Sequence, residues 1–140
     1  MITGHLTSAR EAIIRIAVRG AGAREETIDA IIDTGFDGFL TLPASFVSDL
    51  ALPFAGATKA ALGDGSEVSL DAFEAVVAWD NDERRVVTLA TTGEPLVGMA
   101  MLSGYRVALD VVEGGRVAIQ AISKNRRQQP APEVRPRLGR

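Results

Sequence analysis

The sequence predicts an all-β domain with one or two short helices, either a small closed barrel of six or seven short strands or a sandwich. Short apolar runs recur at close spacing between residues 14 and 121, and such runs with alternating polarity are typical of half-buried strands. Turn-forming residues, mainly glycine and aspartate, separate the runs. No long amphipathic segment is available for the crossover helices that a parallel βαβ sheet requires.

Two strands lead into a loop that begins with an acid. Residues 14–18 alternate apolar with charged or small side chains, which is the period of a strand with one buried face. A glycine-containing turn follows at residues 20–22, and residues 26–32 resume an extended pattern that ends in two isoleucines. Residues 33–38 then form a loop of turn-forming residues, and residues 39–42 form a short strand.

A short helix and three hairpins complete the expected domain. Pro43 suits the first position of a helix, which Pro53 ends. The hairpins pair residues 58–62 with 67–70, residues 73–79 with 84–91, and residues 105–112 with 116–121. The first turn contains Asp64-Gly65, a dipeptide typical of a type I′ turn, in which both central residues have positive φ.

The composition divides the chain into a domain and a tail. The 140 residues suffice for one domain, and we expect residues 1–122 to form it. We expect residues 123–140 to form a disordered tail. This segment contains six lysine and arginine residues and three prolines but few apolar side chains, so it cannot bury enough surface to offset the entropy of ordering. A basic tail can contact nucleic acid or an acidic partner, although a solvated tail is the more common outcome of such a composition.

The composition also excludes several classes of function. The net charge of −3 gives no indication of a nucleic-acid or membrane partner. Cysteine is absent, which removes disulfides, thiol nucleophiles and thiolate metal sites. The only histidine, His5, lies near an N-terminus that we expect to be mobile, and it cannot supply a metal cage or a well-placed catalytic triad. Because there is no signal-peptide pattern and no apolar run of about 18 residues, we expect a soluble, cytoplasmic protein. The absence of cysteine and the single histidine lead us to expect no metal site, and we expect no other cofactor.

The central motif is Asp33-Thr34-Gly35, which directly follows two β-branched apolar residues. A buried strand would hold the carboxylate rigidly, the Thr34 hydroxyl can bond to backbone groups, and Gly35 permits a second chain to approach closely. The same residue types are also common where an ordinary strand ends in a turn. The tripeptide alone therefore does not decide between chemistry and a turn.

Elements further along the chain place this tripeptide in a wider pattern. A glycine-containing hairpin follows it, and Leu96-Val97-Gly98 then precedes a short expected helix. In this order of motifs, residues 11–121 resemble the retropepsin-like aspartic peptidases, in particular the small bacterial members with single-domain subunits. The resemblance implies the acid-protease type of barrel, a peptide or protein substrate, a homodimer, and no cofactor.

The resemblance also implies roles for the residues of the loop. Asp33 corresponds to the catalytic aspartate, Thr34 to the residue whose hydroxyl bonds across the dimer, and Gly35 to the glycine beneath the reactive carboxylates. Asp37 corresponds to a second acid that contacts the substrate backbone. In retroviral relatives this second acid also pairs with an arginine, and Met99 stands at that position here.

Two further segments correspond to functional parts of the family. The loop at residues 62–66 corresponds to the flap that covers a bound peptide, and we name it the flap. The residues expected to contact substrate there are Gly63, Asp64 and Gly65, and those expected to pack behind the catalytic loop are Leu96, Val97 and Gly98. Phe36 stands where the family often has alanine or serine, so a narrower neighbouring pocket is expected. Ala100 stands where bacterial relatives often carry an acid.

Aspartic proteolysis requires two carboxylates that share one proton, because two such groups cannot both ionise at close range. The chain has one acid in this motif, so a twofold dimer would bring Asp33 against its own copy. The main alternative is a non-catalytic peptide- or protein-binding module on the same fold. A phosphoryl-transfer aspartate, as in actin-like nucleotide folds, would require a longer chain with two domains.

Overall fold

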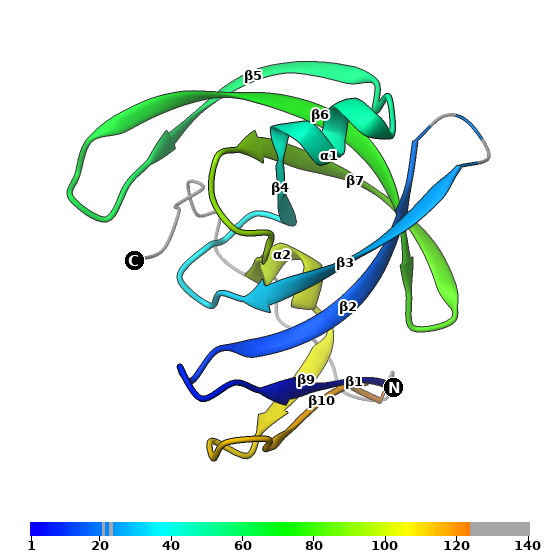
Figure 1. Cartoon of the computed structure of the whole chain (residues 1–140), viewed down its shortest axis with the longest axis vertical. Helices are drawn as coiled ribbons and strands as arrows, with labels where there is room; N and C mark the ends of the chain where they lie inside the picture. The colour runs from blue at the N-terminus through cyan, green and yellow to red at the C-terminus, as the bar shows by residue number, and fades with distance from the viewer. Residues whose placement is uncertain (21, 23, 124–140) are drawn as a thin grey trace.

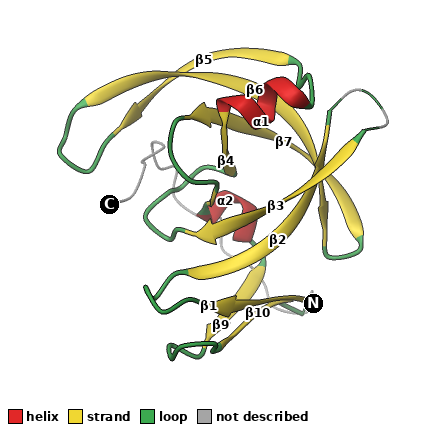
Figure 2. Cartoon of the chain, in the orientation of Figure 1, coloured by secondary structure: helices red, strands yellow, loops and turns green. Residues whose placement is uncertain are grey.

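The computed structural model describes residues 1–20, 22 and 24–123 (Figure 1). Of these residues, 57% lie in strands and 8% in two short helices, which confirms the expected predominance of β structure (Figure 2). The strands are β1 (Ile2–Leu6), β2 (Ala12–Arg19), β3 (Glu25–Ile32), β4 (Leu40–Pro43), β5 (Phe54–Ala61), β6 (Glu67–Trp79), β7 (Asp82–Thr91), β8 (Leu96–Val97), β9 (Tyr105–Leu109) and β10 (Arg116–Ala121). The helices are α1 (Ala44–Asp49) and α2 (Met99–Leu102). The tail expected at residues 123–140 lies outside the described residues, apart from Ser123.

All the described strands belong to one sheet, in the order β5-β6-β7-β4-β8-β3-β2-β1-β10-β9. The long strand β6 also pairs with β2, with Val77 opposite Val18, although the two strands are not neighbours in this order. Figure 1 shows the β2–β3 and β6–β7 pairs crossing at one side of the molecule. The sheet therefore bends round so that strands from both halves face a common interior.

The core consists of aliphatic side chains from the inward faces of these strands. Its fully buried members include Ile14, Val18, Leu40 and Val77, together with the large ring of Trp79. The alternation that predicted β2 is borne out, since its residues are in turn buried and partly or fully exposed. Burial of these side chains is the main favourable contribution to folding, at roughly 1.5–3 kcal/mol for each large residue.

The ten strands of the described chain outnumber the six or seven expected for the barrel, and β1 accounts for part of the difference. Residues 67–70 and 73–79, expected as separate strands, form the single strand β6. The sequence of β1 carries Gly4 and His5 between two apolar ends, so no strong alternation marks it. Pairing on both sides, with β2 and β10, fixes this segment as a strand. The expectation of a mobile N-terminus around His5 is therefore wrong, because tertiary pairing overrides a weak local pattern.

The flap turn differs from the type I′ turn that the Asp-Gly dipeptide predicted. Among its described residues only Gly65 has positive φ, at 87°. Asp64 instead accepts hydrogen bonds from the Ser66 backbone N–H at 2.9 Å and the Ser66 hydroxyl at 2.6 Å, and such a local Asx-type bond favours another turn geometry. The positive φ values required at both central positions occur in the next hairpin, at Asp80 (52°) and Asn81 (67°).

The expected end of the first strand in the last hairpin is also corrected. Strand β9 ends at Leu109 instead of residue 112, and Val111 and Val112 are 60% and 67% exposed in the following turn. This turn is closed by a hydrogen bond from the Gly115 N–H to the Val112 carbonyl, at 2.8 Å. Valine has a high β-propensity, but here the geometry of the turn determines the conformation of Val111 and Val112.

Helix α1 begins and ends one or more residues away from the expected positions. Pro43 is its N-cap instead of its first residue, and the helix ends at Asp49, before Pro53 is reached. Ala51 has φ of 49°, in the left-handed region that terminates helices. Within the described residues, neither helix has the length and apolar character needed to cross a membrane.

Candidate active site

Backbone hydrogen bonds between β3 and β8 fix the position of Asp33. The two strands run parallel, with Ile31 opposite Leu96 and Ile32 opposite Val97. The Asp33 N–H donates to the Val97 carbonyl oxygen at 2.9 Å. Asp33 is therefore the first residue of the loop after the paired part of β3. Its hydrogen bond to Val97 strongly restricts its backbone.

The Asp33 carboxylate is held close to its own loop. Its Oδ1 atom accepts a hydrogen bond from the Gly35 N–H at 2.9 Å, and its backbone carbonyl accepts one from the Phe36 N–H at 3.1 Å. Asp33 is only 3% exposed in the single chain, whereas Thr34 and Gly35 are exposed. Thr34 and Gly35 are thus exposed to solvent beside the buried Asp33.

The segment after β8 is bonded to the same loop. The Phe36 carbonyl accepts the Met99 N–H at 2.8 Å, the Gly38 carbonyl accepts the Ala100 N–H at 3.1 Å, and the Gly98 N–H donates to Phe39 at 3.0 Å. The structure therefore brings together the two segments that sequence reasoning had linked, residues 33–38 and Leu96-Val97-Gly98. In the sheet β8 lies between β3 and β4, the two strands that the loop of residues 33–38 connects.

Close packing beneath the loop depends on two glycines. A Cβ atom on Gly98 would lie 2.2 Å from the Gly38 carbonyl oxygen and 2.6 Å from the Phe36 ring. A Cβ atom on Gly38 would also lie 2.6 Å from that ring. Phe36 is 1% exposed and packs with Ala72 and Leu89. Its ring thus fills the interior below the loop in this chain and does not form the wall of an open neighbouring pocket.

The second acid, Asp37, lies on the same loop and is partly buried. Met99, which stands where retroviral relatives have an arginine, is 46% exposed at the start of α2. A different arginine reaches this helix, since Arg84 of β7 donates to the Met101 carbonyl at 2.8 Å and stacks over the Phe39 ring at 5.8 Å. The sequence pattern contained no signal for this contact.

The flap forms the tip of the β5–β6 hairpin. Figure 1 shows this tip and the loop between β3 and β4 on the same side of the molecule. Midway along the hairpin, Leu70 of β6 packs against the small cluster that contains Phe36, and so does Leu96 of β8. The hydrogen bonds from Ser66 hold the pKa of the Asp64 carboxyl below its ordinary value. The hairpin that carries the predicted flap residues thus contacts the cluster beneath the loop through Leu70.

A buried threonine that sequence reasoning missed anchors β8. The Thr41 hydroxyl donates to the Glu94 carbonyl at 3.2 Å and accepts the Leu96 N–H at 3.0 Å. Thr41 is 1% exposed, in a strand that is otherwise apolar. A hydroxyl within a buried apolar run is a usable signal, since buried polar groups are nearly always hydrogen-bonded.

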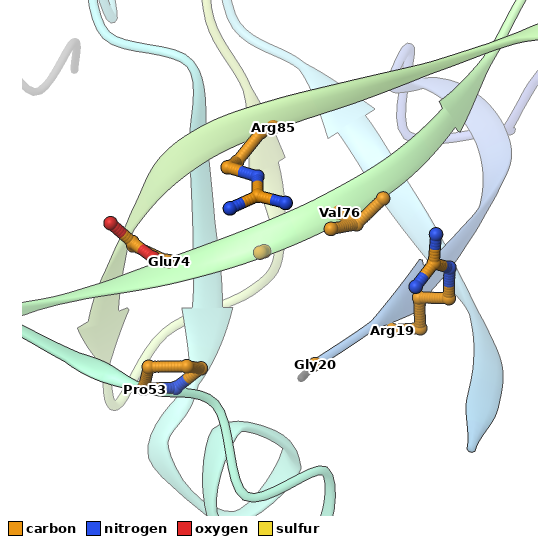
Figure 3. Close-up of a pocket in the computed structure, with 7 residues that line it drawn as sticks. Arg19, Gly20, Pro53, Glu74, Val76 and Arg85 are labelled. Carbon is orange, nitrogen blue, oxygen red and sulfur yellow. The ribbon is translucent and has the colours of Figure 1, made fainter. Parts of the chain in front are cut away.

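One cavity lies away from the predicted site residues. It has a volume of about 220 Å³ and lies near the crossing of β2 and β6, where Figure 3 shows Arg85 and Glu74 on one side and Arg19 on the other. Arg19 is already engaged, because it donates to Glu83 at 2.7 Å, and this hydrogen bond raises the pKa of its guanidinium group. Among the described residues, the other two charged ones that line the cavity, Arg85 and Glu74, carry opposite charges. The cavity therefore has little net charge with which to attract an ion.

Comparison with other proteins does not assign a function to the site. A scan of the chain against models of protein families found no match, and a search of curated proteins found no similar sequence. In the described part of the chain, no three acids or histidines converge into a group that could hold a metal ion. The functional interpretation therefore rests on the residues and geometry of the chain itself.

Proposed function

We propose that the chain is one subunit of a retropepsin-like aspartic endopeptidase, that its working form is a homodimer, and that each chain contributes Asp33 as its catalytic carboxylate. One observation carries the proposal: Asp33 is fixed by the backbone of β8 and by the Gly35 N–H, directly beside the exposed Thr34-Gly35 edge. A rigid acid next to a small, exposed backbone suits a site completed by a second chain.

The proposed fold is the closed barrel of this family. The pairing of β6 with β2 supports it, because it connects β2, β3, β8, β4, β7 and β6 into a ring of hydrogen-bonded strands. A ring without free edges in this region would hold the Asp33 loop at one end of the barrel with little freedom.

The proposed reaction is hydrolysis of a peptide bond by an activated water. The two Asp33 carboxylates of a dimer share one proton. The ionised carboxylate takes a proton from water, the resulting oxygen attacks the peptide carbonyl, and the protonated carboxylate gives its proton to the carbonyl oxygen. Collapse of the tetrahedral intermediate breaks the C–N bond, and the leaving nitrogen takes up a proton from the dyad. The reaction requires no covalent enzyme intermediate.

Other predicted residues have supporting roles in this proposal. Thr34 bonds across the dimer, Gly35 lies beneath the carboxylates, and Asp37 contacts the substrate backbone. The flap closes over the peptide, and Gly63 and Gly65 on either side of Asp64 give its tip the freedom to move. Closure would exclude water from the carboxylates and strengthen electrostatic contacts with substrate.

One observation favours a second candidate, a non-catalytic peptide-binding module on the same fold. Asp33 is 3% exposed in the single chain, whereas a catalytic carboxylate must reach water and substrate. A rearrangement on dimerisation would be needed to uncover it. A binding module would need no such change.

Peptide-library cleavage at several pH values tests the proposal, with Asp33→Asn as the paired variant. The proposed function predicts cleavage that the variant lacks, with circular dichroism and melting close to those of the unsubstituted chain. Equal cleavage by a clean preparation of Asp33→Asn would remove Asp33 from the mechanism. A stable dimer that binds peptides but never cleaves them would support the binding module.

A further inference from the structure

Two adjoining cavities form a groove between the β5–β6 hairpin and α1. One has a volume of about 490 Å³ and reaches from Leu62 at the flap to Thr91 at the end of β7. The other, of about 300 Å³, continues over α1. They share three lining residues, Ala44, Asp71 and Ala90. The shared residues make the two cavities parts of one elongated groove.

The walls of this groove are mainly small or aliphatic. The wall residues include Leu62, Val68 and Leu70 at one end and Val47 and Leu52 at the other. An elongated groove with these walls suits an extended segment with alternating apolar side chains better than a compact polar ligand.

Asp71 is the only charged residue among the described residues that line either cavity. It is exposed on β6, and no hydrogen bond or ion pair joins its carboxylate to another residue within 1–20, 22 and 24–123. Thr91, which lines the same groove, has a buried hydroxyl with no hydrogen-bond partner in the part of the chain that the structure describes. The exposed Asp71 carboxylate can pair with a ligand that carries one positive charge and hydrogen-bond donors.

We propose that this groove binds an extended peptide that places a lysine or arginine side chain against Asp71 and aliphatic side chains on either side of it. Charge complementarity selects this occupant, because a single carboxylate in a groove whose other described lining residues are uncharged favours one cation. The inference rests on the proposed function in assuming a peptide ligand. It adds a specificity that the acid-protease mechanism does not require.

The test measures peptide binding by fluorescence anisotropy with the full chain carrying Asp33→Asn, so that the probe is not consumed. The probes are a labelled octapeptide with a central Val-Lys-Leu and the same peptide with norleucine, a neutral side chain of similar length, in place of lysine. The lysine peptide should bind about two- to fivefold more tightly at low salt, the range expected for a solvent-accessible ion pair. High salt should reduce the difference.

Two further variants locate the effect. Asp71→Asn should make the two peptides bind equally, whereas Glu74→Gln, which removes the same charge from the same strand outside the groove, should preserve the preference. Equal binding of the two peptides by the chain with Asp71 intact would overturn the proposal. If, in addition, a peptide copying residues 124–140 displaced both probes, the groove would belong to the chain's own basic segment.

A cleavage assay with Asp33 intact separates this inference from the proposed function. A lysine preference in binding without any cleavage would support the groove assignment and count against the peptidase. Cleavage with no preference for a basic side chain at any position would support the peptidase and overturn the role of Asp71.

Discussion

The backbone N–H of Asp33 and the carbonyl oxygen of Val97 are joined by a hydrogen bond of 2.9 Å. This bond ties the candidate catalytic acid to a short strand that lies far along the chain and has only two residues, β8. The position of the acid therefore depends on how firmly β8 is held. Thr41 holds it from the opposite side, through the Glu94 carbonyl and the Leu96 N–H.

Replacing Thr41 should disturb both stability and catalysis. Thr41→Val removes the hydroxyl and with it two part-buried hydrogen bonds, to the Glu94 carbonyl and from the Leu96 N–H, at a cost of about 0.5–1.5 kcal/mol each in the free energy of unfolding. We also expect kcat to fall with little change in KM, because β8 would hold Asp33 less accurately. Urea unfolding and steady-state kinetics measure the two effects. Thr41→Ser, which keeps the oxygen, should recover most of kcat, and an unchanged kcat in Thr41→Val would limit Thr41 to a role in stability.

Gly98 should tolerate no side chain. A Cβ atom there would lie 2.2 Å from the Gly38 carbonyl oxygen, so Gly98→Ala must displace the backbone of the Asp33 loop. We expect a loss of about 1–3 kcal/mol in unfolding free energy, measured by denaturant titration, together with loss of activity. Gly93→Ala is the matched control, since a Cβ atom at Gly93 meets nothing within 4 Å and should change stability by less than about 0.5 kcal/mol. Similar stability of the two variants would show that the packing beneath the loop is adaptable.

The flap should be sensitive to its backbone conformation more than to its packing. Gly65 has φ of 87°, and a Cβ atom added there would meet nothing within 4 Å, so Gly65→Val should cost about 1–2 kcal/mol, from the left-handed conformation alone. Turnover should decline more than this modest change in stability explains. Gly93→Val is the control, because a Cβ atom at Gly93 also meets nothing within 4 Å but the φ of Gly93 lies outside the left-handed region. Wild-type turnover in Gly65→Val would mean that this hairpin does not act as a flap.

The flap tip should also loosen in strong acid. The Ser66 hydroxyl and N–H lower the pKa of Asp64 in the folded chain, so this carboxyl binds protons less readily in the folded state than in the unfolded state. Its contribution to stability is therefore fully present above the ordinary aspartate pKa of about 3.9 and is lost as pH falls through the lowered folded value. NMR titration should show the Asp64 pKa rising toward its ordinary value in Ser66→Ala. An unchanged Asp64 pKa in Ser66→Ala would show that the Ser66 hydroxyl does not lower it.

The sequence predicted those parts of the fold that depend on local pattern. Alternation identified β2, and turn residues identified all three hairpins. The sequence did not predict β1, because Gly4 and His5 weaken its alternation. Pairing with a distant segment, β10, helps to make these residues a strand. Sequence reasoning also failed at Val111 and Val112, where strand-forming residues occupy a turn.

The candidate site shows the same division. Asp33-Thr34-Gly35 could be singled out from residue types alone, and Leu96-Val97-Gly98 from resemblance. The parallel pairing that joins these segments depends on long-range topology, which local periodicity does not encode. The low exposure of Asp33 likewise results from packing across several elements.

The most direct test of the shared dyad is sedimentation velocity across a dilution series, with specific activity measured on the same samples. One chain carries one acid of this motif, so activity should fall in proportion to the dimer fraction. Thr34→Ala should shift both curves together, because loss of about 1 kcal/mol per hydrogen bond at two symmetric positions weakens dimerisation roughly tenfold or more. Cleavage at full specific activity by a species that remains monomeric at every concentration would contradict the account.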